Sequence, residues 1–183
     1  MRLLLHICCA PCSIYPVEVL RQKNHDILGF FYNSNIHPYK EYLKRMETLA
    51  QYSRRIYLQV VFSETYDLEG FLRTVAFREN DRCRFCYYDR LKAAARMAKA
   101  NGFDAFTSTL LYSKYQKHDL IQSIGETVSQ EIGVRFYYED FRSGWKEGVE
   151  QSRMMGMYRQ PYCGCIYSEK ERYCRSGGRR SDA

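Results

Sequence analysis

RLLLHICCAPC, residues 2–12, is the stretch that decides the fold of this chain. Residues 2–7 are nearly continuous in Leu and Ile, which predicts a buried strand of the kind that helices cover on both faces of a parallel sheet. Residues 11–23 predict a helix directly after this strand. Ligand sites in such sheets form at the carboxyl ends of the strands. The cysteines between the strand and the helix are therefore expected at a binding edge.

Short apolar runs alternate with amphipathic stretches along the rest of the chain. Strands are predicted at 27–32, 56–62, 103–109 and 134–138, and helices at 39–55, from about 67, from 80–83 to 100, at 118–131 and at 144–157. This alternation favours an α/β fold with a doubly wound, mostly parallel sheet, Rossmann-like and nucleotide alpha-hydrolase-like. The length of 183 residues fits one domain, predicted over 1–175, and the Gly- and Arg-rich residues 176–183 are predicted to be a disordered basic tail.

Seven of the eight cysteines fall into three groups, and only Cys174 stands apart. The first group is Cys8, Cys9 and Cys12, the second is Cys83 and Cys86, and the third is Cys163 and Cys165. Thiolates two or three residues apart can point at one centre, so three such groups indicate a soft metal or an iron–sulfur cluster. The second group lies near the N-terminus of a predicted helix, where the helix dipole stabilises thiolate.

Disulfides and structural zinc are the alternatives. The chain shows no secretory signal and no apolar run long enough for a membrane span, which predicts a reducing, cytoplasmic compartment. Clustered cysteines in such a compartment bind metals or catalyse more often than they cross-link. A zinc site takes four ligands and would leave three of the seven cysteines unexplained. The third group keeps two interpretations: a strained, redox-active disulfide or a pair of metal ligands.

Three further residues near the predicted site carry open alternatives. Asp81 can reach a metal, but it can also serve as a helix N-cap. Cys12 can bind a second metal, react as a thiol or be buried as a small hydrophobe. His37, in the loop after the second strand, can donate a proton or have a packing role.

Charge and aromatic content indicate an anionic partner. The formal net charge is +7 and the pI is near 9.0, with 17 tyrosines against one tryptophan. Tyrosine interleaves with Lys and Arg at 84–90, 112–118 and 157–162, a mixture suited to RNA, where rings stack on bases and cations hold phosphates. An ordinary amphipathic surface is the alternative. No Gly-rich phosphate loop or dinucleotide fingerprint occurs, so a nucleotide cofactor has no support.

Five motifs together resemble those of a known family. They are HICCAPC (6–12), YNSNIHP (32–38), CRFCY (83–87), STLL (108–111) and YRQPYCGC (158–165). This ordered set is similar to the QueH-type epoxyqueuosine reductases and covers nearly the whole chain. The sequence departs from the family pattern at Ser34 and Lys114, where proline is common. Both positions lie in loops beside the site, outside the expected metal ligands.

The resemblance implies the last step of queuosine synthesis in tRNA, in which the epoxide on a modified wobble guanine is reduced to an alkene. It implies a [4Fe–4S] cluster and no cobalamin. The residues carried over as cluster ligands are Cys8, Cys9, Cys83 and Cys86, and those carried over as a redox-active pair are Cys163 and Cys165. A second iron, held by leftover thiols such as Cys12 and by Asp81, is compatible with this assignment.

The implied reaction and substrate suggest further roles. Opening the epoxide needs an acid, for which His37 or a thiol is the candidate, and an external electron donor. A splayed anticodon base needs stacking rings and phosphate-contacting cations. The candidates for these RNA contacts are Lys114, Tyr115, Lys117, Arg84 and Arg159.

Two rival functions predict different properties. A non-catalytic zinc-bearing RNA-binding module would be colourless and bind RNA without turnover. A thiol-dependent nucleotide-processing enzyme, such as a sulfur transferase, would need a phosphate-binding loop after the first strand. Cysteines occupy that position instead, which counts against this second rival.

Overall fold

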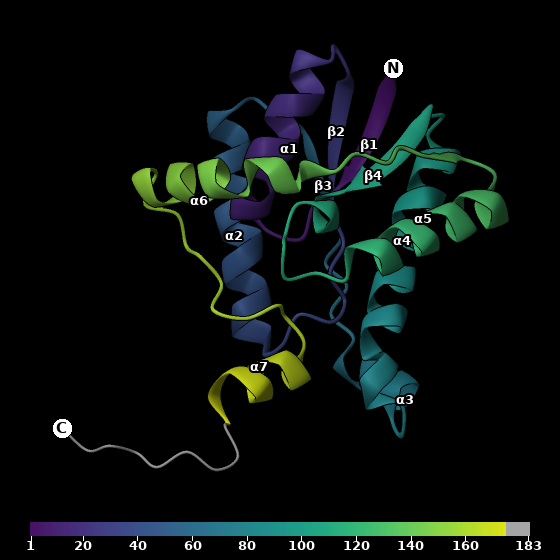
Figure 1. The fold of residues 1–183 in the computed structure, drawn as a ribbon, viewed down its shortest axis with the longest axis vertical. Coiled ribbons are helices and arrows are strands. Elements are labelled where there is room, and N and C mark those ends of the chain that lie inside the picture. Colours follow the sequence, from purple (N-terminus) through teal and green to yellow (C-terminus); the bar gives the residue numbers. More distant parts are fainter. Residues whose placement is uncertain (175–183) are drawn as a thin grey trace.

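The computed structural model describes residues 1–174, and within them it confirms the predicted α/β fold (Figure 1). Five parallel strands form one sheet in the order β3-β2-β1-β4-β5. The strands are β1 Arg2–His6, β2 Asp26–Phe31, β3 Val60–Phe62, β4 Ala105–Ser108 and β5 Arg135–Phe136. The tail predicted for 176–183 lies outside the described residues.

Helices cover both faces of this sheet, with α1, α2 and α6 on one side and α4 and α5 on the other (Figure 1). The α-helices are α1 Ala10–Gln22, α2 Tyr39–Arg55, α3 Leu68–Val75, α4 Arg82–Ala100, α5 His118–Ile132, α6 Trp145–Met154 and α7 Ile166–Tyr173. Short 3-10 helices are η1 Glu79–Asp81, η2 Thr109–Leu111 and η3 Phe141–Gly144. In the described residues, no helix is both long enough and apolar enough to cross a membrane.

Two elements differ from their predicted form. The strand predicted at 56–62 begins only at Val60, because Ile56 and Leu58 still close the last turn of α2. The amide of Leu58 donates to the carbonyl oxygen of Ser53 at 2.9 Å, so this amide belongs to the end of the helix and not to the sheet. The sequence patterns also left α7 unpredicted. This short helix starts directly after Cys165 and has no buried residue, so it lacks the apolar face that reveals a helix in a sequence.

The central strand of the sheet, β1, lies in the core of the protein. Leu3, Leu4 and Leu5 of β1 are fully buried, as expected for a strand with helices on both faces. At its carboxyl end, His6 ties three strands together. Its Nδ1 lies 2.8 Å from the hydroxyl of Ser108 at the end of β4, and its Nε2 lies 3.0 Å from the carbonyl oxygen of Tyr32, just after β2. These two hydrogen bonds of His6 hold the carboxyl ends of β1, β2 and β4 together, directly before the turn that carries the first cysteine group.

Candidate active site

The first cysteine group lies in the turn from β1 to α1. Cys9 occupies the N-cap position of α1 in an extended conformation, and Cys12 lies in the first turn of that helix. The turn brings the three buried thiols together, so that their sulfur atoms all lie within 4.8 Å of one another. The sulfurs of Cys8 and Cys9 are 3.8 Å apart, and those of Cys9 and Cys12 are 2.6 Å apart.

The three thiols differ in their pKa values. Hydrogen bonds from Cys12, from Cys9 and from the Thr109 hydroxyl hold the pKa of Cys8 well below its usual range, although burial opposes this. Burial raises the pKa of Cys9, and the hydrogen bond to Cys8 raises that of Cys12. Among the three thiols, Cys8 is therefore the one that loses its proton most readily. A soft cation that displaces the remaining protons fits this donor set.

The second group lies in the first two turns of α4, where Cys83 and Cys86 are three residues apart and half-buried. Burial raises the pKa of Cys86 to about 12, and the charge of Arg90 opposes this shift. Asp81 occupies the N-cap position of α4, but its side chain makes no capping hydrogen bond. Its carboxylate is exposed and forms no hydrogen bond to a described residue.

Arg90 connects the second group to the other two. Its side chain is 4 % exposed, and its Nε and Nη2 donate to Oδ1 of Asn35 at 3.1 and 2.7 Å. Burial alone would lower the pKa of this guanidinium, and the charges of Cys86, Cys8 and Cys163 raise it instead. Arg90 lines one cavity together with Cys8 and Cys163, and it lies on the same helix as Cys83 and Cys86. Among the described residues, only the sulfur atoms of Cys8, Cys9 and Cys12 form a set of three that all lie within 4.8 Å of one another, so the structure does not bring Cys83 or Cys86 into that set.

The third group lies in the segment before α7, which α2 holds in place. Arg45 is 1 % exposed, and its Nη1 donates to the carbonyl oxygen of Cys163 at 2.8 Å, while its Nη2 donates to that of Tyr162 at 3.1 Å. The Nε of Arg45 donates to Glu41 at 2.7 Å. Glu41 in turn accepts from the hydroxyl of Tyr158. A buried ion pair thus clamps the backbone that carries Cys163.

His37 holds the same segment from the other side. Its amide donates to the carbonyl oxygen of Gly164 at 2.8 Å, and its Nδ1 accepts from the amide of Ile166 at 3.2 Å. The hydroxyl of Tyr162 donates to the His37 carbonyl oxygen. Burial, assisted by Arg90, lowers the pKa of His37 to about 4, so the imidazole is neutral. The ring is 1 % exposed and lies against Tyr66 and Phe71.

Gly164 is required between the two cysteines of the third group. Its φ is +154°, a conformation that side chains rarely adopt. A Cβ at this position would lie 3.2 Å from Ile36 and 3.3 Å from Nη1 of Arg45. The close approach of the glycine backbone is what lets Arg45 reach the carbonyl oxygen of Cys163.

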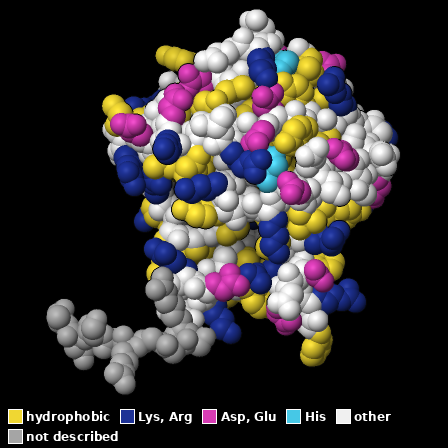
Figure 2. Space-filling view, viewed as in Figure 1, with side chains coloured by type: hydrophobic (Ala, Val, Ile, Leu, Met, Phe, Trp, Pro, Cys, Tyr) yellow, Lys and Arg dark blue, Asp and Glu magenta, His cyan; other side chains and the backbone are white. Residues whose placement is uncertain are grey.

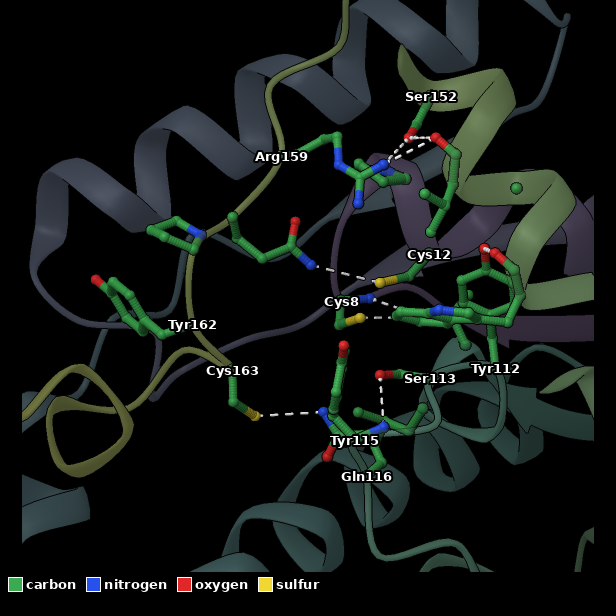
Figure 3. A pocket seen from close by; sticks show the side chains of 18 of the residues that line it. Cys8, Cys12, Tyr112, Ser113, Tyr115, Gln116, Ser152, Arg159, Tyr162 and Cys163 are labelled. Carbon is green, nitrogen blue, oxygen red and sulfur yellow. Dashed lines mark hydrogen bonds between the residues drawn. The ribbon is translucent and has the colours of Figure 1, made fainter. Parts of the chain in front are cut away.

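A cavity of about 550 Å³ opens between these elements (Figure 3). Its walls include sulfur-bearing residues of the first and third groups, namely Cys8, Cys12 and Cys163, together with Arg90. Aromatic rings from the loop after η2 and from α6 form much of the remaining wall, with Tyr112 tilted against Trp145 at a centroid distance of 5.2 Å. This volume is in the range that accommodates one small-molecule ligand.

Two side-chain amides point at the sulfurs around this cavity. The Nε2 of Gln160 lies 2.9 Å from the sulfur of Cys9 and 3.5 Å from that of Cys12. The Nε2 of Gln116 lies 3.3 Å from the sulfur of Cys163, as the dashed line in Figure 3 shows. Amide donors stabilise thiolate over thiol, so both glutamines favour charge on the sulfurs.

The predicted site residues do not all reach this cavity. Cys86 lines a second cavity of about 410 Å³ instead, and neither Cys165 nor His37 lines the first. Cys163 and Cys165 are both free thiols in this structure. Among the predicted RNA contacts, Tyr115 and Arg159 line the 550 Å³ cavity, while Lys114, Lys117 and Arg84 are exposed outside it. Arg159 donates within the cavity wall, to Val149 and Ser152.

The sequence patterns missed several residues of the site. Arg45 and Arg90 look like ordinary charged positions on amphipathic helices, and only their burial distinguishes them. Gln160 was part of the YRQPYCGC motif, but a glutamine carries no spacing rule that marks it as a thiolate partner. Trp145 begins a helix and gave no signal apart from being the single tryptophan.

Comparisons with known proteins agree with one another. The family model described as epoxyqueuosine reductase QueH matches residues 3–171. Among curated proteins, the epoxyqueuosine reductase QueH of Dehalococcoides mccartyi is 34% identical over 172 residues, covering 94% of each chain. That of Thermotoga maritima is 35% identical, covering 92% of this chain and 91% of the relative. A solved structure titled as a predicted subunit of tRNA methyltransferase, from Methanocaldococcus jannaschii, matches with a TM-score of 0.52 at 12% identity, covering 82% of this chain and 76% of that one, which supports the fold alone.

Proposed function

This chain belongs to the epoxyqueuosine reductase QueH family, and it is an oxidoreductase that reduces epoxyqueuosine to queuosine. We propose that its substrate is the modified wobble nucleotide of a tRNA anticodon. The reaction takes two electrons and two protons. Both C–O bonds of the epoxide break, an alkene forms, and the oxygen leaves as water. The protein must therefore place the epoxide against a source of electrons and supply protons to the departing oxygen.

The observation that carries this proposal is the 550 Å³ cavity, because its walls bring thiols of the first and third groups together. A ligand the size of one modified nucleoside fits this volume. Aromatic walls from Tyr112 and Trp145 suit a planar base, and Arg159 supplies a polar donor. The sulfurs of Cys8, Cys12 and Cys163 then face the bound ligand from two sides.

We assign the cofactor to the cysteines of the first two groups. Cys8, Cys9, Cys83 and Cys86 would hold a [4Fe–4S] cluster, which supplies electrons one at a time. The close packing of Cys12 with Cys8 and Cys9 supports a further metal-binding role for Cys12. Asp81 as a ligand of a second iron stays a prediction, since its exposed carboxylate has no partner among the described residues.

We assign Cys163 and Cys165 to a two-electron step. Oxidising this dithiol to a disulfide releases the two electrons and two protons that one turnover consumes. An external electron donor would then reduce the disulfide again. Burial raises the pKa of Cys163, which keeps the proton on this thiol, while the amide of Gln116 and the guanidinium of Arg90 oppose that shift.

His37 as the proton donor stays a prediction. The contacts of His37 support a second role, because its backbone and Nδ1 hold the segment around Gly164. The thiol of Cys163 is better placed to protonate the epoxide oxygen, since Cys163 lines the cavity and His37 does not.

The test starts with protein purified without oxygen and analysed for iron, acid-labile sulfide and zinc. We expect about four irons and four sulfides per chain, and conversion of an epoxyqueuosine-containing anticodon stem-loop to queuosine with dithionite as reductant. Cys9→Ser and Cys86→Ser should lose sulfide and activity together. Cys174→Ser is the matched control, because this exposed cysteine lies outside the three groups.

Zinc in place of iron, no sulfide and no turnover after reconstitution would overturn the cofactor assignment. Such a result, with RNA affinity retained, would favour the non-catalytic zinc-bearing RNA-binding module. Iron and sulfide with turnover of the free nucleoside only would contradict the tRNA part of the proposal while leaving the reductase activity in place.

A further inference from the structure

Tyr115 presents an aromatic ring to solvent at the mouth of the cavity. The residue is 79% exposed and lines the cavity all the same. Its ring stands edge-on to that of Trp145, with centroids 5.4 Å apart and an interplanar angle of 87°. Figure 3 shows Tyr115 in the middle of the view, between Cys163 and Tyr112. Most of the Tyr115 ring is thus free to contact something that extends beyond the cavity.

A cation lies beside these two rings. The Nζ of Lys114 is 5.5 Å from the ring centroid of Tyr115 and 5.8 Å from that of Trp145. The helix that begins with Trp145 carries exposed Lys146 and Arg153 together with exposed Glu147 and Glu150, and Figure 2 shows charged side chains over α6. Rings and cations in this mixture are the means by which proteins bind single-stranded nucleic acid.

The loop that carries Tyr115 is fixed in advance. The amide of Tyr115 donates to the hydroxyl of Ser113 at 3.3 Å. The buried hydroxyl of Tyr87 donates to Oε1 of Gln116 at 2.7 Å and accepts from the amide of Lys117 at 3.3 Å. A ring held by a rigid loop loses little conformational entropy on binding. The Tyr115 ring is therefore exposed on a loop that hydrogen bonds hold in one conformation.

We propose that the ring of Tyr115, which packs edge-on against Trp145, forms a stacking platform for the nucleotide next to the reacting one. This inference rests on the proposed function. One modified nucleoside fills the cavity, so the neighbouring base of an anticodon loop must lie across its mouth, where Tyr115 stands. The platform makes the enzyme select an RNA loop over the free nucleoside, and Lys114 contacts the phosphate between the two nucleotides.

The experiment places 2-aminopurine, whose fluorescence falls on stacking, at either neighbour of the wobble position in a synthetic anticodon stem-loop. Binding to the iron-loaded protein should quench the probe at one neighbour. Tyr115→Ala should abolish this quenching and raise the KM for the stem-loop by about tenfold, with kcat unchanged. Tyr115→Phe keeps the ring and should behave as the wild type. Tyr57→Ala is the control, because Tyr57 is 93% exposed and precedes β3, away from the cavity.

Equal KM values for wild type and Tyr115→Ala, or quenching that persists in Tyr115→Ala, would overturn the platform. An equal loss with the free nucleoside would also overturn it, since Tyr115 would then contact the reacting base itself. The proposed function fails separately, if the wild type binds the stem-loop but reduces neither substrate. In that case the quenching still decides whether the platform exists.

Discussion

The guanidinium of Arg45 donates from Nη1 to the carbonyl oxygen of Cys163 at 2.8 Å, across 118 positions of sequence. This hydrogen bond joins the middle of α2 to the segment that carries the third cysteine group. It is part of a buried set that also includes Glu41 and the carbonyl oxygen of Tyr162. The position of the Cys163 backbone at the cavity therefore depends on a side chain far from it in sequence.

Arg45→Lys should weaken both the fold and the placement of Cys163. Lysine keeps the positive charge beside Glu41 but lacks the fork of donors that reaches two carbonyl oxygens. We expect the free energy of unfolding in urea to fall by about 2 kcal/mol, and the alkylation rate of Cys163 to change. Tyr158→Phe removes a single hydrogen bond to Glu41 and should cost about 1 kcal/mol. Wild-type stability and alkylation in Arg45→Lys would contradict the clamp.

Gly164→Ala should strain the turn between Cys163 and Cys165. The added Cβ meets Ile36 and Arg45, and alanine rarely adopts a φ of +154°. We expect a loss of about 1–3 kcal/mol in the free energy of unfolding, and at least a partial loss of reductase activity. Gly156→Ala separates the two causes, because Gly156 has a φ of +63° and nothing within 4 Å of its added Cβ. That control should lose some stability and keep full activity.

His37 should make stability depend on pH in the acidic range. Burial lowers its pKa to about 4 in the folded protein, from the ordinary value of 6.5. The unfolded chain therefore binds a proton first, so the stabilising contribution is complete above pH 6.5 and is lost as the pH falls towards 4. The full loss is about 3 kcal/mol. Burial also lowers the pKa of His6 to about 4, so the His37 contribution is the difference between wild type and a His37 variant in urea unfolding between pH 7 and pH 4. His37→Asn, which keeps an acceptor but does not titrate there, should flatten this part of the profile, and an unchanged slope would contradict the assignment.

Lys114→Gln should reduce the salt dependence of RNA binding. Each phosphate contact releases counterions, and for a single strand the slope of log K against log salt changes by about 0.7 per contact. We expect a slope smaller by about this amount for an anticodon stem-loop. Lys23→Gln is the matched control, because Lys23 follows α1 at the opposite edge of the sheet and pairs with Glu139. Parallel salt plots for Lys114→Gln and wild type would remove Lys114 from the RNA contacts.

The sequence predicted well those features that depend on near neighbours. The apolar run of residues 2–7 gave the central strand, because burial on both faces leaves no polar alternation. Cys9 and Cys12 were recognisable as one group because three residues span less than one helical turn. The short strand β3 was overestimated, since apolar residues that end a helix and those that start a strand look alike in a short window.

By itself, the sequence determined the α/β class, the three cysteine groups and the family, because periodicity and short spacing are local properties of a chain. Only the tertiary structure decided which groups meet. Arg90 lines the same cavity as Cys8 and Cys163, and Arg45 reaches the Cys163 carbonyl oxygen. These partners lie tens of residues apart or more, or on different elements. Their proximity follows from the packing of helices on the sheet, which local patterns do not encode.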